Sequence, residues 1–269
     1  TEARNFEAVL DLMATGALDI APLISHRFAF EDAPAAYEAL SADKSALGIV
    51  LEFDHAVEER HIRQVQLRQA QSHSSSPTSQ VTIGFIGAGN YASRVLMPAF
   101  RSAGARLRSV ASSGGTSAVV HGQKSDFEIA TSDPETIFGD MAINTVAIAT
   151  RHNTHASFAA KALSAGKHVF VEKPLAMTVE EIATVEDALA ASDRQLMVGF
   201  NRRFAPHSIK IKSLLESVAL PKSFIMVMNA GAIPGDHWTQ DQAVGGGRII
   251  GEACHFIDLM RFFAGFPIV

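Results

Sequence analysis

The sequence predicts an α/β fold built on a doubly wound parallel sheet, and two observations support this prediction. From residue 81 onward, short apolar segments alternate with helical patterns, and a glycine-rich turn follows the first apolar segment. Continuously apolar strands are typical of sheets buried on both faces, in which parallel strands are joined by right-handed helical crossovers.

The apolar segments give the order of the elements. The expected strands are residues 81–86, 106–111, 145–150, 168–172 and 195–200. Helical patterns cover residues 91–103, 155–165 and 179–191. A new strand is expected at 223–229 and a last helix at 252–264.

The chain before residue 81 has a different character. Residues 1–56 are expected to form helix, strand, helix and strand. Residues 54–71 are charged and rich in glutamine, which suggests an exposed helix, and the serine-rich stretch 72–79 is typical of a linker. We therefore predict four parts, which are residues 1–56, a helix and linker at 57–80, a dinucleotide-binding domain at 81–200, and a further domain at 201–269.

The composition argues against nucleic acids, metal ions and membranes as partners. The 269 residues are 47% hydrophobic and 19% charged, with a net charge of −5, so no basic face for nucleic acid is expected. One cysteine, Cys254, excludes an internal disulfide, and the histidines lack zinc-ligand spacing, so no metal site is expected. No apolar run has the length of a membrane span and no signal peptide is visible, which indicates a cytoplasmic protein without membrane partners.

The glycine-rich turn predicts a Rossmann-type dinucleotide site. Gly87 permits a tight turn after the strand, Gly89 lets the main chain approach a pyrophosphate, and Ala92 is small enough for close packing of helix on strand. The helix N-terminus then faces the phosphates. The expected cofactor-binding residues of the turn are Gly87, Ala88, Gly89, Asn90 and Tyr91. A methyltransferase has a related turn, so the turn alone leaves the ligand open.

The choice between NAD and NADP stays open as well. An acid about 20 residues after the turn favours NAD, and an arginine there favours NADP. This chain has Ser112 and Ser113 after the second strand, and small hydroxyl residues accept either cofactor.

Three further stretches carry a resemblance to a known family. Ala149-Thr150-Arg151-His152-Asn153-Thr154-His155 joins a strand to a helix, Glu172-Lys173-Pro174 ends another strand, and Gly245-Gly246-Gly247 precedes His255-Phe256-Ile257-Asp258-Leu259. With the glycine turn, over about residues 81–269, they resemble the Gfo/Idh/MocA oxidoreductases, NAD(P)-dependent enzymes that act mostly on sugars, inositols and related alcohols. The resemblance implies that residue 201 begins an α+β open-sheet substrate domain, of which only the first part is present.

The resemblance also implies the catalytic residues. Lys173 would lie beside the reacting carbon and share in proton transfer, with Glu172 positioning it and both near the cofactor. The residues agree, because Lys173 ends a parallel strand, where open α/β sheets bind ligands. His255 would be a second acid or base. The family pattern has an aspartate four residues before it, where this chain has Gly251, so Glu252 is the candidate partner or else an acid that stabilises a helix N-terminus.

Other motif positions are implied to contact cofactor or substrate. Thr150, Asn153 and His155 match the nucleotide-contacting stretch of the family. Arg203 and His207 match a segment near the substrate entrance, with an ordinary solvated face as the alternative. The stretch Asp236-His237-Trp238 is a weaker candidate for the substrate pocket.

The first fifty residues have their own resemblance. Leu12–Asp19, Pro22–Phe28 and Ala33–Glu38 are similar to the carboxyl-terminal end of a medium-chain, zinc-type alcohol dehydrogenase, without its zinc or glycine-turn motifs. Both chain ends look cut. We therefore expect a fragment of a bi-domain oxidoreductase, with such a dehydrogenase fused ahead of the Gfo/Idh/MocA module.

The expected activity is hydride transfer between a nicotinamide cofactor and a sugar, inositol or related secondary alcohol or ketone. The expected partners are a polyol or sugar-like substrate and a second copy of the chain, bound through the second-domain sheet. The fragment itself is expected to lack a complete substrate pocket. The alternative is a non-catalytic NAD(P)-binding regulatory module, which the absence of an aspartate at Gly251 favours.

Overall fold

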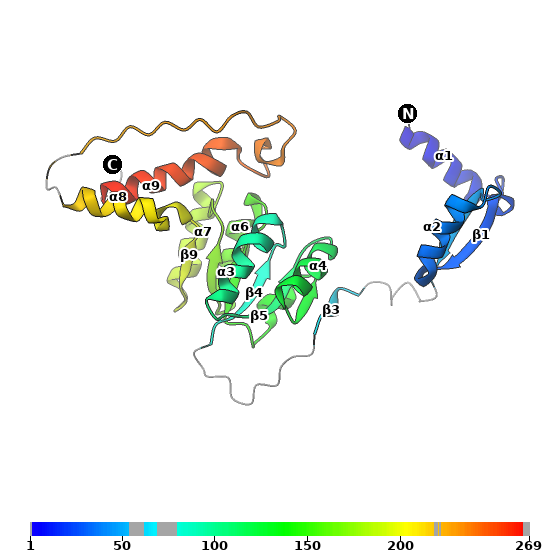
Figure 1. Cartoon of the computed structure of the whole chain (residues 1–269), viewed down its shortest axis with the longest axis horizontal. Coiled ribbons are helices and arrows are strands. Elements are labelled where there is room, and N and C mark those ends of the chain that lie inside the picture. The colour runs from blue at the N-terminus through cyan, green and yellow to red at the C-terminus, as the bar shows by residue number, and fades with distance from the viewer. Residues whose placement is uncertain (1, 54–61, 69–79, 218–219, 221, 266–269) are drawn as a thin grey trace. The chain divides into compact units, whose positions relative to one another are not determined.

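The computed structural model of the chain describes residues 2–53, 62–68, 80–217, 220 and 222–265 (Figure 1). Two compact units divide between Ile62 and Arg63. The first contains α1 (Glu2–Ala14), η1 (Ala21–Leu23), β1 (Ile24–Ala29), η2 (Phe30–Asp32), α2 (Ala33–Ala42) and β2 (Gly48–Glu52). Within it β1 and β2 pair in parallel, with α2 as the connecting helix. The expected order of helix, strand, helix and strand is confirmed.

The second unit is built on a seven-stranded sheet of order β3-β6-β5-β4-β7-β8-β9. Its strands are β3 (Gln64–Gln66), β4 (Thr82–Ile86), β5 (Arg106–Ala111), β6 (Ile129–Thr131), β7 (Thr145–Ile148), β8 (His168–Val171) and β9 (Leu196–Val198). The six strands from β4 to β9 are parallel, and the order reverses at β4, which lies between β5 and β7. The predicted doubly wound Rossmann sheet is confirmed.

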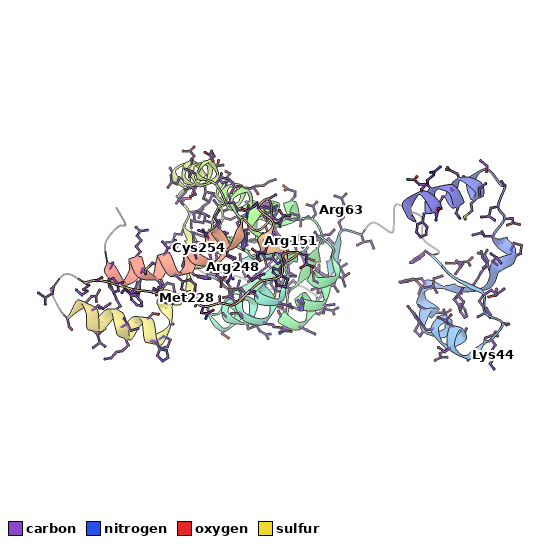
Figure 2. All side chains as sticks on the ribbon, turned by 90° about the horizontal axis from the view of Figure 1, so that it is seen from above. Lys44, Arg63, Arg151, Met228, Arg248 and Cys254 are labelled. Carbon is purple, nitrogen blue, oxygen red and sulfur yellow. The ribbon has the colours of Figure 1, made fainter. Side chains whose placement is uncertain are left out.

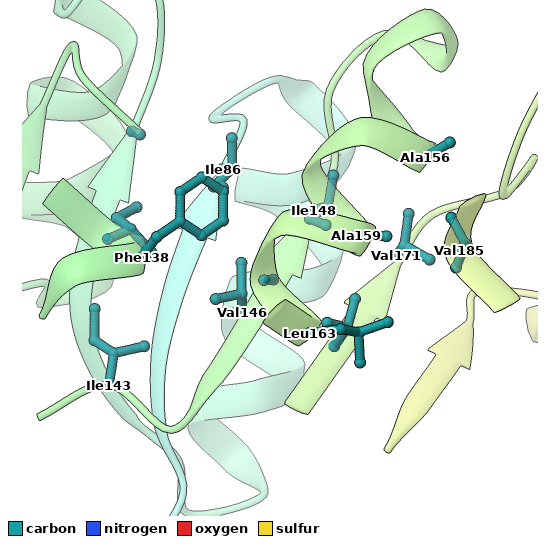
Figure 3. Close-up of a cluster of buried hydrophobic side chains, with 14 residues drawn as sticks. Ile86, Phe138, Ile143, Val146, Ile148, Ala156, Ala159, Leu163, Val171 and Val185 are labelled. Carbon is teal, nitrogen blue, oxygen red and sulfur yellow. The ribbon is translucent and has the colours of Figure 1, made fainter. Parts of the chain in front are cut away.

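Helices cover both faces of this sheet. They are η3 (Ala92–Leu96, a π-helical stretch), α3 (Met97–Ser102), α4 (Thr116–Ser125), α5 (Glu135–Gly139), η4 (His152–Thr154), α6 (His155–Ser164) and α7 (Val179–Ala190). Alternate residues of β4 serve different cores, because side chains of a strand point to opposite faces. Phe85 packs with Met97 and Phe127 on one face, while Ile86 packs with Val146 and Leu163 on the other (Figure 3).

One expected helix is wrong where the structure describes it. Residues 64–66, predicted within an exposed helix, form β3, which pairs antiparallel with β6. The next residue, Leu67, donates its N–H to the carbonyl of Glu128 at 2.8 Å and packs against the core. A partner strand some sixty residues away in sequence outweighs the local charged pattern. Residues 54–61 and 69–79, which hold the rest of that helix and the linker, lie outside the described residues.

The strand expected at residues 223–229 is not formed either. The segment is extended, but no neighbouring strand pairs with it in the part of the chain that the structure covers. Ile225 is 93% exposed and Val227 is 84% exposed. An apolar, β-branched segment becomes a strand only when a neighbour supplies the ladder hydrogen bonds.

After the sheet come short helices and turns that reach the carboxyl-terminal helix. They are η5 (Asn201–Phe204), α8 (Pro206–Glu216), η6 (Trp238–Gln240), η7 (Ile249–Ala253, π-helical) and α9 (Cys254–Ala264). Helices α8 and α9 lie side by side (Figure 1). Among the described helices, none is both long and apolar enough to cross a membrane.

Candidate active site

The glycine turn follows β4, at the point where the strand order reverses. Gly87 has a φ of +105°, and a Cβ there would lie 2.3 Å from the carbonyl oxygen of Ala149, so both conformation and space require glycine. At Gly89 the situation is opposite, since a Cβ would have no atom of the described residues within 4 Å. The main chain at Gly89 therefore faces open space.

The helix that follows offers its amino end to that space. Its first backbone bond to the turn runs from Ser93 N–H to Gly89 O at 2.9 Å, and the earlier N–H groups of a helix have no acceptor within it. Ala88 and Ala92 are buried in the packing of helix on sheet, whereas Asn90 and Tyr91 are exposed. An open glycine edge beside free helix N–H groups fits the pyrophosphate of a dinucleotide.

Ser112 and Ser113 follow β5 but lie differently. The hydroxyl of Ser112 accepts hydrogen bonds from Ala118 N–H at 3.1 Å and from the Ser117 hydroxyl at 2.9 Å, so it is engaged at the start of α4. Ser113 is exposed. Of the two predicted contacts, Ser113 is thus the more available to a ribose.

The three residues predicted after β7, which are Thr150, Asn153 and His155, have different surroundings. Thr150 lines a large cavity, and its hydroxyl lies 2.7 Å from that of Thr154. His155 is 1% exposed, with Nδ1 at 2.7 Å from Pro174 O and Nε2 at 3.2 Å from Thr150 O. Both carbonyl oxygens only accept, so the neutral ring donates to one of them, and the shorter distance favours Pro174 O. Asn153 is exposed and is not among the residues lining the cavity.

Glu172 and Lys173 directly follow β8 and line the same cavity. The ammonium of Lys173 donates to the carbonyl oxygen of Gly251 at 2.9 Å. Burial raises the pKa of the Glu172 carboxyl, and that carboxylate packs so close to Gly199 that a Cβ there would lie 2.8 Å from Oε1. Nearby, the phenol oxygen of Tyr91 accepts from Asn201 Nδ2 at 2.9 Å.

His255, on the first turn of α9, also lines the cavity. Burial, with Lys173 and Arg202 nearby, lowers the pKa of His255 to about 4. Its Nδ1 is buried and has no hydrogen-bond partner among the residues described. Glu252, its predicted partner, instead binds Arg248 (labelled in Figure 2) at 2.8 and 3.0 Å.

The cavity that these residues share lies beside the glycine turn and has a volume of about 780 Å³. Its walls come from the strand ends, from η5 and from α9. The lining residues are Tyr91, Ala149, Thr150, His152, His155, Glu172, Lys173, Asn201, Arg202, Phe204, Ala205, Trp238 and His255. A lysine, a carboxyl group and an imidazole thus border one space large enough for a small ligand and the end of a cofactor.

Some predicted entrance residues lie elsewhere. Arg203 forms an ion pair with the buried carboxylate of Asp258, so its guanidinium is engaged between η5 and α9. His207 is exposed and does not line the cavity. Of the stretch 236–238, only Trp238 lines it, whereas the His237 ring bonds to Thr239.

The sequence-based assignment missed His152 and Arg202. Both line the cavity, next to residues that were predicted in their place, Asn153 and Arg203. His152 and Asn153 lie in the 3₁₀ turn η4, where successive side chains point about 120° apart, so an offset of one residue changes the direction completely. A signal was present in the paired imidazoles His152 and His155, whose i,i+3 spacing places them on one face.

Comparison with known proteins agrees with this geometry. Residues 81–200 match the family model described as "Oxidoreductase family, NAD-binding Rossmann fold", the Gfo/Idh/MocA model. This part of the chain is therefore similar to the Rossmann domain of the Gfo/Idh/MocA oxidoreductases. The predicted family resemblance is confirmed for it.

The proteins to which this chain is similar include named dehydrogenases. Levoglucosan dehydrogenase from Pseudarthrobacter phenanthrenivorans is 34% identical over 146 residues, 52% of this chain and 37% of its own length. Inositol 2-dehydrogenase 2 from Saccharopolyspora erythraea is 35% identical over 142 residues, 51% of this chain and 40% of its own. The chain thus spans less than half the length of both relatives.

Solved structures give the same fold. A levoglucosan dehydrogenase in complex with NADH and L-sorbose matches with a TM-score of 0.60 and 30% identity, over 69% of this chain and 53% of its own. A putative myo-inositol dehydrogenase from Sinorhizobium meliloti 1021 matches with a TM-score of 0.61 and 27% identity, over 71% and 57%.

Proposed function

We propose that the chain carries the cofactor-binding half of an NAD(P)-dependent dehydrogenase that acts on a CH–OH group of a sugar, an inositol or a related polyol. The observation that carries this proposal is the shared cavity of Lys173, Glu172 and His255 beside the open edge of Gly89. The names of the relatives support the substrate class, with levoglucosan and inositols as the first compounds to test.

In this proposal the glycine turn and the helix start hold the cofactor. Gly87, Ala88, Gly89, Asn90 and Tyr91 receive the pyrophosphate, with Thr150 and Ser113 nearer the nucleoside ends. When bound, the nicotinamide supplies the hydride acceptor or donor. Whether the ribose contact selects NAD or NADP is decided by titration with both reduced forms.

Lys173 and His255 act on the substrate oxygen. Lys173, held by Gly251 O at 2.9 Å, has further ammonium protons that can hydrogen bond to a substrate hydroxyl or ketone oxygen. His255 is neutral at pH 7 because its pKa lies at about 4, so its ring can accept the hydroxyl proton. The buried carboxyl of Glu172 fixes the strand end from which Lys173 projects.

The first experiment measures binding and turnover separately. NADH and NADPH binding to the full chain is followed by the change in their fluorescence, and a panel of levoglucosan and inositols is then assayed with the oxidised cofactors. Lys173→Ala should lower kcat about 100-fold or more while the cofactor Kd changes little, because it removes a proton-transfer group. Lys161→Ala is the matched control, since Lys161 is an exposed lysine paired with Glu135.

A second candidate function is a non-catalytic NAD(P)-binding module. It is favoured by Glu252, whose carboxylate is held by Arg248 and so is not available to His255. Binding of cofactor with no turnover of any compound in the panel, in this chain and in the full-length protein, would establish that function instead.

We also propose an origin for the first unit and a role for the last residues. The β1–α2–β2 arrangement supports a medium-chain dehydrogenase tail in residues 1–56, fused ahead of the Gfo/Idh/MocA domain as in a bi-domain oxidoreductase. The extended, exposed segment around Ile225 and Val227 supports assembly of an open sheet from residue 201 onward, through which two copies of the protein would associate. Size-exclusion chromatography with light scattering of the full-length protein tests that association.

A further inference from the structure

His152 lies where a side chain at residue 251 would have to be. A Cβ on Gly251 would be 2.9 Å from Cε1 and 3.3 Å from Nδ1 of the His152 ring. Gly251 is buried in η7 and does not have a positive φ, so its backbone conformation does not demand glycine. Glycine is needed there because a side chain has no space: the His152 ring is nearest, and the Gly245 carbonyl oxygen would lie 3.3 Å from the Cβ.

The His152 ring is fixed in one orientation. Its Nδ1 lies 2.8 Å from the carbonyl oxygen of Gly245, and its plane stands at 74° to the Trp238 ring, with the centroids 4.8 Å apart. A carbonyl only accepts, so Nδ1 carries the proton and Nε2 of the neutral ring is left as an acceptor. Burial lowers the pKa of His152, which keeps the ring neutral at pH 7.

That free acceptor belongs to the cavity of the candidate active site. His152 lines the cavity although it is only 6% exposed, and no hydrogen bond to Nε2 occurs among the described residues. Lys173 approaches Gly251 as well, through its bond to the Gly251 carbonyl at 2.9 Å. An ammonium donor and a neutral imidazole acceptor thus lie against the same glycine.

We propose that His152 is a substrate-binding residue, whose Nε2 accepts a hydrogen bond from a hydroxyl of the polyol bound beside Lys173. The opposite edge of the ring, with Cε1 and Nδ1, occupies the volume that a side chain at residue 251 would fill, so the glycine makes room for the ring. This proposal rests on the proposed dehydrogenase function and extends it by naming a residue that binds a hydroxyl group of the substrate. A polyol offers several hydroxyl groups, so one can meet Lys173 while a neighbour meets His152.

The shared volume is tested first, without any substrate. Thermal melting is compared for the full chain and for Gly251→Ala, His152→Ala and the double variant. Gly251→Ala should lower the Tm by roughly 3–10 °C, because the added methyl group overpacks against a fixed ring. In the His152→Ala background the same change should cost little. An equal loss of Tm in both backgrounds would overturn the proposal.

The acceptor role is tested with two amides that separate the ring nitrogens. His152→Asn can keep the donor to Gly245 and has no group at Nε2, whereas the longer side chain of His152→Gln can bring an amide oxygen near that place. With the best compound of the polyol panel, His152→Asn should raise KM about tenfold, the value of one lost hydrogen bond, with kcat and NADH Kd little changed. His152→Gln should recover part of the KM.

The outcomes separate this proposal from the proposed function. A KM for His152→Asn equal to that of the full chain, with its Tm retained, shows that the ring only packs and overturns the substrate-binding role. A parent chain that binds no NADH or NADPH overturns the proposed function itself. If NADH binds and no polyol is turned over, the dehydrogenase function fails together with the polyol contact. The melting comparison then still shows whether the His152 ring occupies the space next to Gly251.

Discussion

The three imidazoles around Lys173 have lost much of their contact with water. Burial is the largest cause that lowers the pKa of His152, His155 and His255, and the positive charge of Lys173 acts on all three in the same direction. A neutral imidazole is both a donor and an acceptor of hydrogen bonds, whereas imidazolium only donates. The site thus keeps its histidines in the form that can accept a proton.

This protonation state predicts how stability depends on pH. The pKa of His255 is about 4 in the folded chain, below the ordinary value of about 6.5 for an unfolded chain. The unfolded state therefore binds more protons between these values, so stability is complete above about pH 6.5 and falls as the pH drops toward 4. The lowered pKa values of His152 and His155 act in the same sense.

Thermal melting between about pH 4 and pH 8 measures this effect. The Tm should rise with pH through the lower half of the range, and His255→Asn should make the rise shallower. His207→Asn is the matched control, because His207 is exposed outside the cavity. An unchanged pH slope in His255→Asn contradicts the assignment of that slope to His255.

Sequence motifs predicted the site residues that have a fixed spacing along the chain. They did not predict contacts between residues that are distant in sequence. Lys173 and His255 follow from the motif, and both line the cavity. The ion pair of Arg203 with Asp258 joins two elements more than fifty residues apart, so no local sequence pattern predicts it. The relation between His152 and Gly251 is likewise visible only when the ring and the Cα are placed together.

Among the elements, the strand–turn–helix from β4 to α3 has two glycines with opposite reasons to be there. Position 87 requires glycine because its φ is positive and because a Cβ would collide with the Ala149 carbonyl, whereas Gly89 borders open space. The first is required by the fold, and the second is required only if something large approaches the main chain.

Alanine at each position separates folding from binding. Gly87→Ala should lower the Tm markedly and abolish cofactor binding, because a Cβ would be 2.3 Å from a carbonyl oxygen. Gly89→Ala should keep the Tm of the parent and weaken NADH binding about tenfold or more, because the methyl group would occupy the pyrophosphate space. Melting and fluorescence titration check both. Equal NADH affinity in Gly89→Ala and the parent chain argues against a pyrophosphate at this turn.

Element prediction succeeded where the apolar period is continuous, and it assigned the wrong structure to two exposed segments. Strands β4, β5, β7, β8 and β9 and helices α3, α6 and α7 follow from their patterns, whereas the short strand β6 and the helices α4 and α5 were not predicted. Residues 64–66 pair as a strand despite polar side chains, and residues 223–229 remain unpaired despite apolar ones. In both cases the deciding factor is a distant neighbour, which local sequence does not contain.

For the whole molecule, the residues assigned to cofactor and substrate all belong to one of the two compact units. The glycine turn, Lys173, His152 and His255 lie in Arg63–Val269, which has its own pair of hydrophobic cores.

Removal of residues 1–62 should therefore leave NADH binding intact. We expect the shortened chain to melt cooperatively and to bind NADH with the Kd of the full chain, because the turn and the cores are retained. Fluorescence titration and circular dichroism check this. A large loss of affinity on this deletion would show that the first unit supports the cofactor site.

Strand β3 has a consequence for where such a chain can be divided. Its three residues cover the outer edge of β6, and the carbonyl of Arg63 also accepts from the Ser132 N–H at 2.8 Å. A cut at residue 80, just ahead of the family match, would remove that cover and leave a row of unpaired main-chain groups on a short apolar strand. Exposed edges of this kind recruit strands from other molecules, so the few residues ahead of the domain protect it from aggregation.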